Sequence, residues 1–223
     1  MKKLFRLIII MIVLSSCAIN YPVPNRLRKE LNCYTGEYTG LDTLINIHGY
    51  YTQKIVLDHR GLYKKINGEF KEIGFDTTYY NFIFFDDGIF IGDIGSHNMT
   101  VKEYLTKMAE DTATFDLRAF YQGTYQIFGD TIKVQYVSYG NANVWFAKEE
   151  WYKIIDKNTI VNFYKENVGL AWEDRNKKAY QPKWYKNAYP SKFVYVEIIP
   201  ESSSWLKGQK WFYCLEKKAH SPM

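Results

Sequence analysis

The sequence predicts a mainly β fold in which an antiparallel meander closes into a barrel with one short helix. Through the middle of the chain, apolar residues recur at every second position, as they do in strands with one buried face. Short turn sequences rich in Asp, Asn and Gly separate these runs. The same region is rich in Tyr and Phe, which favour strands. A β-sandwich built from the same hairpins is the structural alternative.

The first sixteen residues have the composition of an export signal. Lys2, Lys3 and Arg6 form a positive start, and an unbroken apolar run covers residues 7–14. This run is too short to span a bilayer, because a helix needs ~20 apolar residues to cross the hydrocarbon core. We therefore expect residues 1–16 to be a signal peptide that is removed.

The residues around Cys17 resemble the lipobox of bacterial lipoproteins. Leu14, Ser15 and Ser16 precede this cysteine, in the order of one aliphatic and two small residues. The resemblance implies cleavage before Cys17 and attachment to a membrane through acyl chains such as palmitate, which would hold durably when two or more are present. The residue after the cysteine is Ala18. By resemblance to the sorting rules of bacterial lipoproteins, Asp at this position favours the inner membrane, so Ala18 implies the outer membrane, facing the periplasm. The alternative is an ordinary secreted protein cleaved after Ser16.

We expect residues 17–32 to form the lipidated cysteine and an extended tether, because this stretch contains two prolines near its start and no periodicity. Residues 33–223 then form a single domain. Cys33 and Cys214 lie near its two ends, and export to an oxidising compartment favours a disulfide between them. Two unpaired buried thiols are the alternative. No CxxC or HxxxH pattern accompanies either cysteine, so no metal or cofactor is expected.

Four hairpins are expected in the middle of the chain. Their turns are placed at residues 58–61, 86–88, 128–130 and 156–158. The Asp-Gly pair of the second turn favours the positive φ that tight hairpins need. Its first arm, Phe82–Phe85, is apolar on both faces and should lie deep. A last strand is expected over residues 193–199, and the segment ending at Cys214 should pack back onto the fold.

A helix is expected from residue 100 to about residue 108. Thr100 and Glu103 fit a capping box, and apolar residues follow at helical spacing. We expect this apolar stripe to cover the sheet rather than to form a functional surface.

A basic, aromatic connector is predicted between residues 172 and 192. Cations and amphipathic rings suit contact with anionic headgroups or sugars. The alternative is a long solvated loop whose rings pin it to the barrel. The candidate surface-contact residues are Lys177, Lys178, Lys183, Trp184 and Lys186.

Two strand-turn-strand units that return through Thr131-Ile132 and Thr159-Ile160 resemble the meander of lipocalin-like domains found in bacterial lipoproteins. Gly36-Glu37-Tyr38 occupies the place of their Gly-x-Trp signature, and the resemblance covers about residues 34–166. It implies a closed barrel whose interior either holds one small ligand or is filled by side chains.

Composition and motifs narrow the function. Without the three basic residues of the signal, the chain has 26 Lys and Arg and 24 Asp and Glu, which is a net charge of +2. So small a net charge does not favour a nucleic-acid partner. The histidines are scattered, and neither GxSxG nor a P-loop is present, so no catalytic residue is assigned. We expect a non-enzymatic lipoprotein of the cell envelope that binds a small lipophilic or amphipathic ligand. The alternatives are an envelope structural or interaction protein that contacts a glycan, a protein or the membrane through the connector, and a hydrolase.

Overall fold

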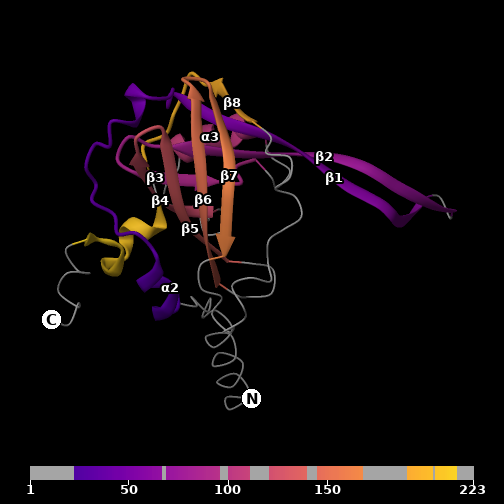
Figure 1. The fold of residues 1–223 in the computed structure, drawn as a ribbon, viewed down its shortest axis with the longest axis horizontal. Helices are drawn as coiled ribbons and strands as arrows, with labels where there is room; N and C mark the ends of the chain where they lie inside the picture. The colour runs from indigo at the N-terminus through magenta and orange to yellow at the C-terminus, as the bar shows by residue number, and fades with distance from the viewer. Residues whose placement is uncertain are drawn as a thin grey trace, which may run out of the picture.

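The chain folds into a closed barrel of eight antiparallel strands in sequence order (Figure 1). The computed structural model describes residues 23–66, 69–95, 100–110, 121–139, 145–167, 190–202 and 204–214. The strands are β1 (Gly49–Ile66), β2 (Glu69–Phe84), β3 (Ile89–Gly92), β4 (Tyr121–Phe128), β5 (Thr131–Tyr139), β6 (Trp145–Asp156), β7 (Thr159–Asn167) and β8 (Pro190–Tyr195). Pairing of β1 with β8 closes the barrel. The predicted fold class is confirmed, and the sandwich alternative is excluded.

Three of the four expected hairpins are confirmed. They join β2 to β3, β4 to β5, and β6 to β7. Gly88 and Gly129 adopt φ of +94° and +60° in the first two turns, a conformation that glycine reaches without steric cost. Phe82–Phe85 is buried, as its continuous apolar character predicts.

The turn predicted for the first hairpin, at residues 58–61, is wrong. β1 continues through residues 58–61 to Ile66, and its connection to β2 lies at residues 67–68, outside the described part. Between the pairs His59–Gly74 and Tyr63–Glu72, β1 advances four residues while β2 advances two. The residues that favour a turn locally are therefore absorbed as a bulge, because the strand pairs with β2 on both sides of them.

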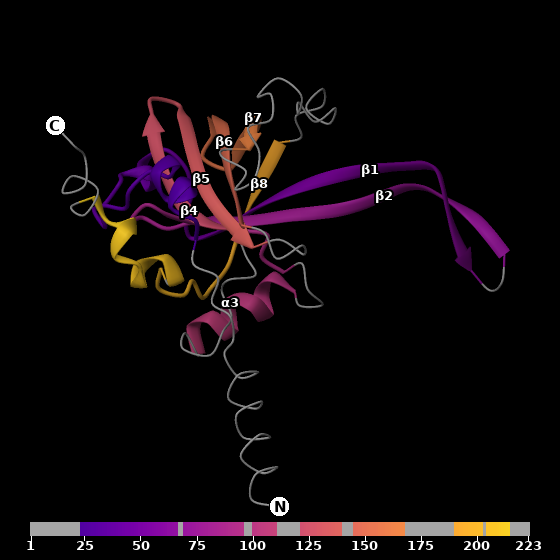
Figure 2. The same cartoon turned by 90° about the horizontal axis from the view of Figure 1, so that it is seen from below.

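The outer parts of β1 and β2 form a projection that we name the β-arm, residues 54–66 and 69–79. β8 pairs with β1 only as far as Gln53, and β3 pairs with β2 only from Phe82. Beyond these points the two strands pair with each other and extend away from the barrel (Figures 1 and 2). The β-arm is thus a two-stranded ribbon whose stability depends on the barrel at its base.

Aromatic rings fill the barrel interior. Alternating positions of the strands point inward, and neighbouring ring centroids lie between 4.9 and 6.3 Å apart, which is contact distance for aromatic pairs. The inward rings, each with less than a tenth of its surface exposed, include Tyr51, Phe82, Phe84, Phe90, Tyr125, Tyr136 and Tyr152.

A second core covers one outer face of the barrel. The helix α2 (Asn25–Glu30) inserts Leu27, and α3 (Val101–Glu110) inserts Leu105 and Met108. The predicted capping box forms, since Thr100 and Glu103 bond to each other's backbone N–H groups. The apolar stripe of α3 therefore packs on the sheet as expected. Packing also extends upstream to Val23, so part of the predicted tether lies against the barrel.

The C-terminal segment completes this outer core. It contains two 3-10 turns, η4 (Trp205–Gly208) and η5 (Lys210–Phe212), which place Leu206 and Phe212 against the barrel. Cys33 and Cys214, the two cysteines expected to pair, form a disulfide with a Cα–Cα distance of 4.7 Å. The 181-residue separation means that this bond ties together the two ends of the folded chain.

Candidate functional site

A buried ionic cluster lies inside the barrel around Glu150. This carboxylate is 1% exposed and accepts hydrogen bonds from the Tyr136 hydroxyl at 2.6 Å, from the Tyr152 hydroxyl and from Asn162 Nδ2 at 3.2 Å. Lys165 forms an ion pair with it. Burial alone would raise the pKa of Glu150, but the Lys165 charge and these hydrogen bonds outweigh it and hold the pKa below its ordinary value.

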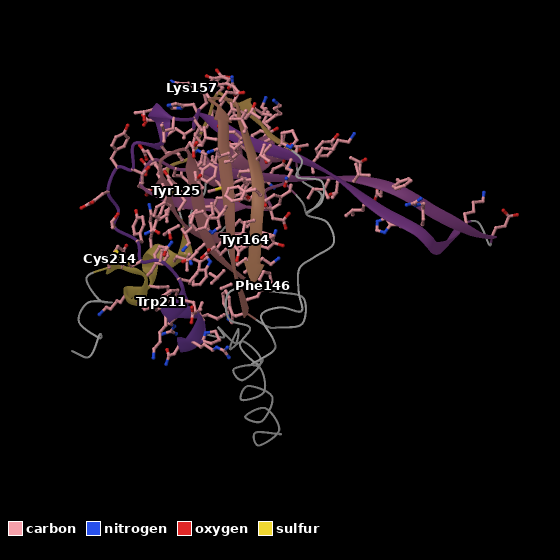
Figure 3. The ribbon with its side chains drawn as sticks, viewed as in Figure 1. Tyr125, Phe146, Lys157, Tyr164, Trp211 and Cys214 are labelled. Carbon is pink, nitrogen blue, oxygen red and sulfur yellow. A yellow bond between two sulfur atoms is a disulfide. The ribbon has the colours of Figure 1, made fainter. Side chains whose placement is uncertain are left out.

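Lys148 interacts electrostatically with Glu150 and Lys165 and lies two residues after Phe146 on β6; Phe146 is labelled in Figure 3. Its ammonium group is 5.0 Å from the Phe146 ring centroid and 5.5 Å from that of Tyr121, both cation–π distances. Burial and, to a smaller extent, the Lys165 charge lower the pKa of Lys148 to about 8, against the opposing effects of Glu150 and Asp93. With Glu150 fully paired and Lys148 held by rings, this cluster completes the packing of the interior.

A cavity of about 560 Å³ lies outside the barrel, at the base of the β-arm. We name it the arm-base groove. Residues of β1 and β2, most of them at outward positions, line it together with the turn after β3 and the start of α3. Six of its lining residues carry hydroxyl groups: Tyr50, Thr52, Thr77, Thr78, Tyr79 and Thr100. The others are Asn81, Asp93, Gly95 and Val101.

Strand alternation explains how the groove acquires this polar lining. Tyr51 and Phe82 pair across β1 and β2 and point into the barrel core. Their sequence neighbours Thr52 and Asn81, which also pair, therefore point outward. Thr100, whose hydroxyl caps the start of α3, lines the same groove.

The turn after β3 is held rigidly at the edge of the groove. Asn81 Nδ2 donates to the Ile94 carbonyl at 3.1 Å, and the Ile94 N–H donates to the Asn81 carbonyl at 3.0 Å. Asp93 has a φ of +60°, the one positive value among the non-glycine residues that the structure describes. An uncommon backbone conformation held by neighbouring bonds is a recurrent feature of binding sites.

Apolar side chains continue from the groove along the same face of the β-arm. Tyr79 is 56% exposed, Phe75 is 61% exposed and Val56 is 37% exposed. The Arg60 guanidinium lies 4.8 Å from the Phe75 ring centroid. The groove and this face form one continuous outer surface, with polar groups at the base and rings along the ribbon.

The residues predicted for lipid attachment and for surface contact have no described position relative to this site. Cys17 and the connector residues Lys177, Lys178, Lys183, Trp184 and Lys186 lie outside the described residues. Sequence reasoning missed the groove, although the alternation within Thr77–Asn81 was a signal for it. In this segment, residues whose hydroxyl and amide groups point outward alternate with residues on the face of β2 that points into the barrel.

Comparisons with family models, curated proteins and solved structures give no match for this chain. Among the residues with described positions, no helix has the length and apolar character needed to cross a membrane. The same residues contain no group of three His, Cys, Asp or Glu side chains arranged to hold a metal ion.

Proposed function

We propose that this chain is a binding protein of the cell envelope, anchored by acyl chains on Cys17, that contacts its partner through the arm-base groove and the β-arm. The observation that carries the proposal is the contrast between the barrel's inside and outside. Packed rings and a paired ionic cluster occupy the interior, whereas the groove and the exposed rings lie on the outer surface.

This contrast favours interaction over the storage of a small ligand. A lipocalin-like carrier needs unfilled space at the barrel axis, and the rings of Phe82, Phe84 and Phe90 contact one another there. The filled barrel instead acts as a rigid support for surface elements. The lipocalin-like resemblance then concerns architecture, and the basic connector remains a further candidate contact.

Anchoring is tested by labelling cells with a palmitate analogue. The chain should incorporate the label and appear in the outer-membrane fraction, and the Cys17→Ser variant should lose both properties. Label-free protein recovered from the aqueous periplasmic fraction would refute the anchor.

Contact through the outer surface is tested with the acylated chain, extracted in detergent and immobilised. It is exposed to three purified envelope fractions, namely membrane vesicles, cell-wall sacculi and surface polysaccharide. The double variant Val56→Ser, Tyr79→Ala should retain less than a fifth of the binding, since both side chains belong to the exposed face. Phe163→Ala, which alters a 50% exposed ring on β7, is the matched control and should bind normally. Binding that is equal in all three proteins would refute the role of the β-arm.

A further inference from the structure

We propose that the arm-base groove binds an uncharged oligosaccharide. This inference rests on the proposed function, because it names the chemical class of the partner that the outer surface contacts.

The lining of the groove matches sugars better than it matches charged ligands. Its hydroxyl and amide groups donate and accept hydrogen bonds and its carboxylate accepts them, as the hydroxyls of a sugar require. The described residues that line the groove include no Lys or Arg. A phosphate, a sulfate or an anionic lipid headgroup would therefore find no cation among these lining residues to pair with.

The lining also disfavours acyl chains. Val101 is the one aliphatic side chain among the described residues that line the groove, so an acyl chain would bury little apolar surface there. The volume of about 560 Å³ nevertheless lies in the range of ~300–1,000 Å³ that is usual for small-ligand sites.

Tyr79 supplies the apolar contact that a sugar needs. One face of a sugar ring carries C–H groups, which pack on aromatic rings, while its edge carries hydroxyls. More than half of the Tyr79 surface is exposed, and Thr77 lies two residues away on the same outward face of β2. A ring beside a hydroxyl thus offers both kinds of contact, and Tyr50 lines the groove from the adjacent strand.

The polar groups are ordered before a ligand arrives. The bond from Asn81 Nδ2 to the Ile94 carbonyl fixes that amide, and the capping box fixes the Thr100 hydroxyl at 2.8 Å from Glu103. Binding then requires little further loss of side-chain freedom, which is an advantage for a site that makes few contacts.

The test uses the full acylated chain in detergent micelles and isothermal titration calorimetry. The probes are chitotriose, maltotriose, cellotriose and, as the anion, inorganic phosphate. We expect at least one trisaccharide to bind with Kd on the order of 0.1–1 mM, as suits a shallow site, and phosphate not to bind. Tyr79→Ala should weaken the affinity at least tenfold, and Thr77→Val, which keeps the shape but removes the hydroxyl, severalfold. Phe75→Ala removes an exposed ring from the same face of the β-arm but outside the groove, and should change Kd less than twofold.

Four outcomes would overturn the inference. Phosphate binding without trisaccharide binding would show an anion site. Trisaccharide binding that survives both Tyr79→Ala and Thr77→Val would place the sugar elsewhere. Absence of saccharide binding, while the chain still binds an envelope fraction through Val56 and Tyr79, would refute the sugar and leave the proposed function standing. Absence of both kinds of binding would refute the two together.

Discussion

Replacing Lys165 by Met should destabilise the barrel more than any exposed charge substitution, because it leaves the Glu150 carboxylate buried without its cation. Removing one member of a buried pair typically costs ~3–5 kcal/mol of unfolding free energy. Here the Lys165 side chain is 27% exposed, and the Tyr136 and Tyr152 hydroxyls still donate to the carboxylate. We therefore expect Lys165→Met to lower the free energy of unfolding by about 2–3 kcal/mol.

A double-mutant cycle isolates the interaction free energy between Lys165 and Glu150. Glu150→Gln keeps the shape and part of the hydrogen bonding and should cost about 1–2 kcal/mol. Once Glu150 is neutral, the loss of Lys165 matters less, so the double variant should cost at least ~1 kcal/mol less than the sum of the single changes. The assay is urea unfolding at pH 7, followed by tryptophan fluorescence and circular dichroism. Lys153→Met is the control, since its ion pair with Asp130 is exposed and should contribute less than ~1 kcal/mol.

The dependence of stability on acidic pH provides a second test of the interaction between Lys165 and Glu150. The folded pKa of Glu150 lies below its unfolded value, so its contribution is complete above the unfolded pKa and is lost as the pH falls through the folded pKa. In Lys165→Met the folded pKa should rise, because burial then acts without the opposing charge. Stability of that variant should fall less on acidification than stability of the wild type. Additive single changes, or an unchanged acid profile, would refute the role assigned to the pair.

Two further predictions concern Lys148 and the disulfide. The folded pKa of Lys148, about 8, is below its unfolded value, so the cost of its charge is fully present below pH 8 and is relieved as the pH rises toward ~10. Lys148→Met should therefore raise the melting temperature at pH 7 and remove this alkaline gain in stability. A lower melting temperature would contradict the assignment. Reduction of Cys33–Cys214, or Cys33→Ser with Cys214→Ser, should cost up to ~4–5 kcal/mol in the chain-entropy model, measured by urea unfolding with and without reductant. Unchanged stability would mean that packing alone holds the ends together.

Strand alternation and turn chemistry predicted most of the barrel. The turns before Ile89, Thr131 and Thr159 follow from local residue preferences, and the helix at Val101 follows from its capping box. The turn at residues 58–61 failed because long-range pairing with β2 outweighed a local preference. The short helix at Asn25 was missed because six residues carry too little periodicity to be distinguished from a tether.

The adjacent carboxylates Glu149 and Glu150 illustrate where sequence reasoning stops. Alternation predicts that they face opposite sides of a strand, and the structure agrees, since Glu149 bonds to Gln135 and Trp151 while Glu150 lies in the interior cluster. Which of them is buried depends on the register of β6 against β5 and β7. A shift of one residue would exchange their environments.

The sequence by itself determined the alternation of inward and outward side chains and the positions of three turns, because these depend on neighbouring residues. It favoured the pairing of the two distant cysteines over two free thiols, because an even number remains after Cys17. Tertiary structure alone decided that rings fill the barrel, that Lys165 reaches Glu150 and that a polar groove forms where the β-arm leaves the wall. These features depend on barrel closure, strand register and the separation of β1 from β8, which bring together residues far apart in the chain.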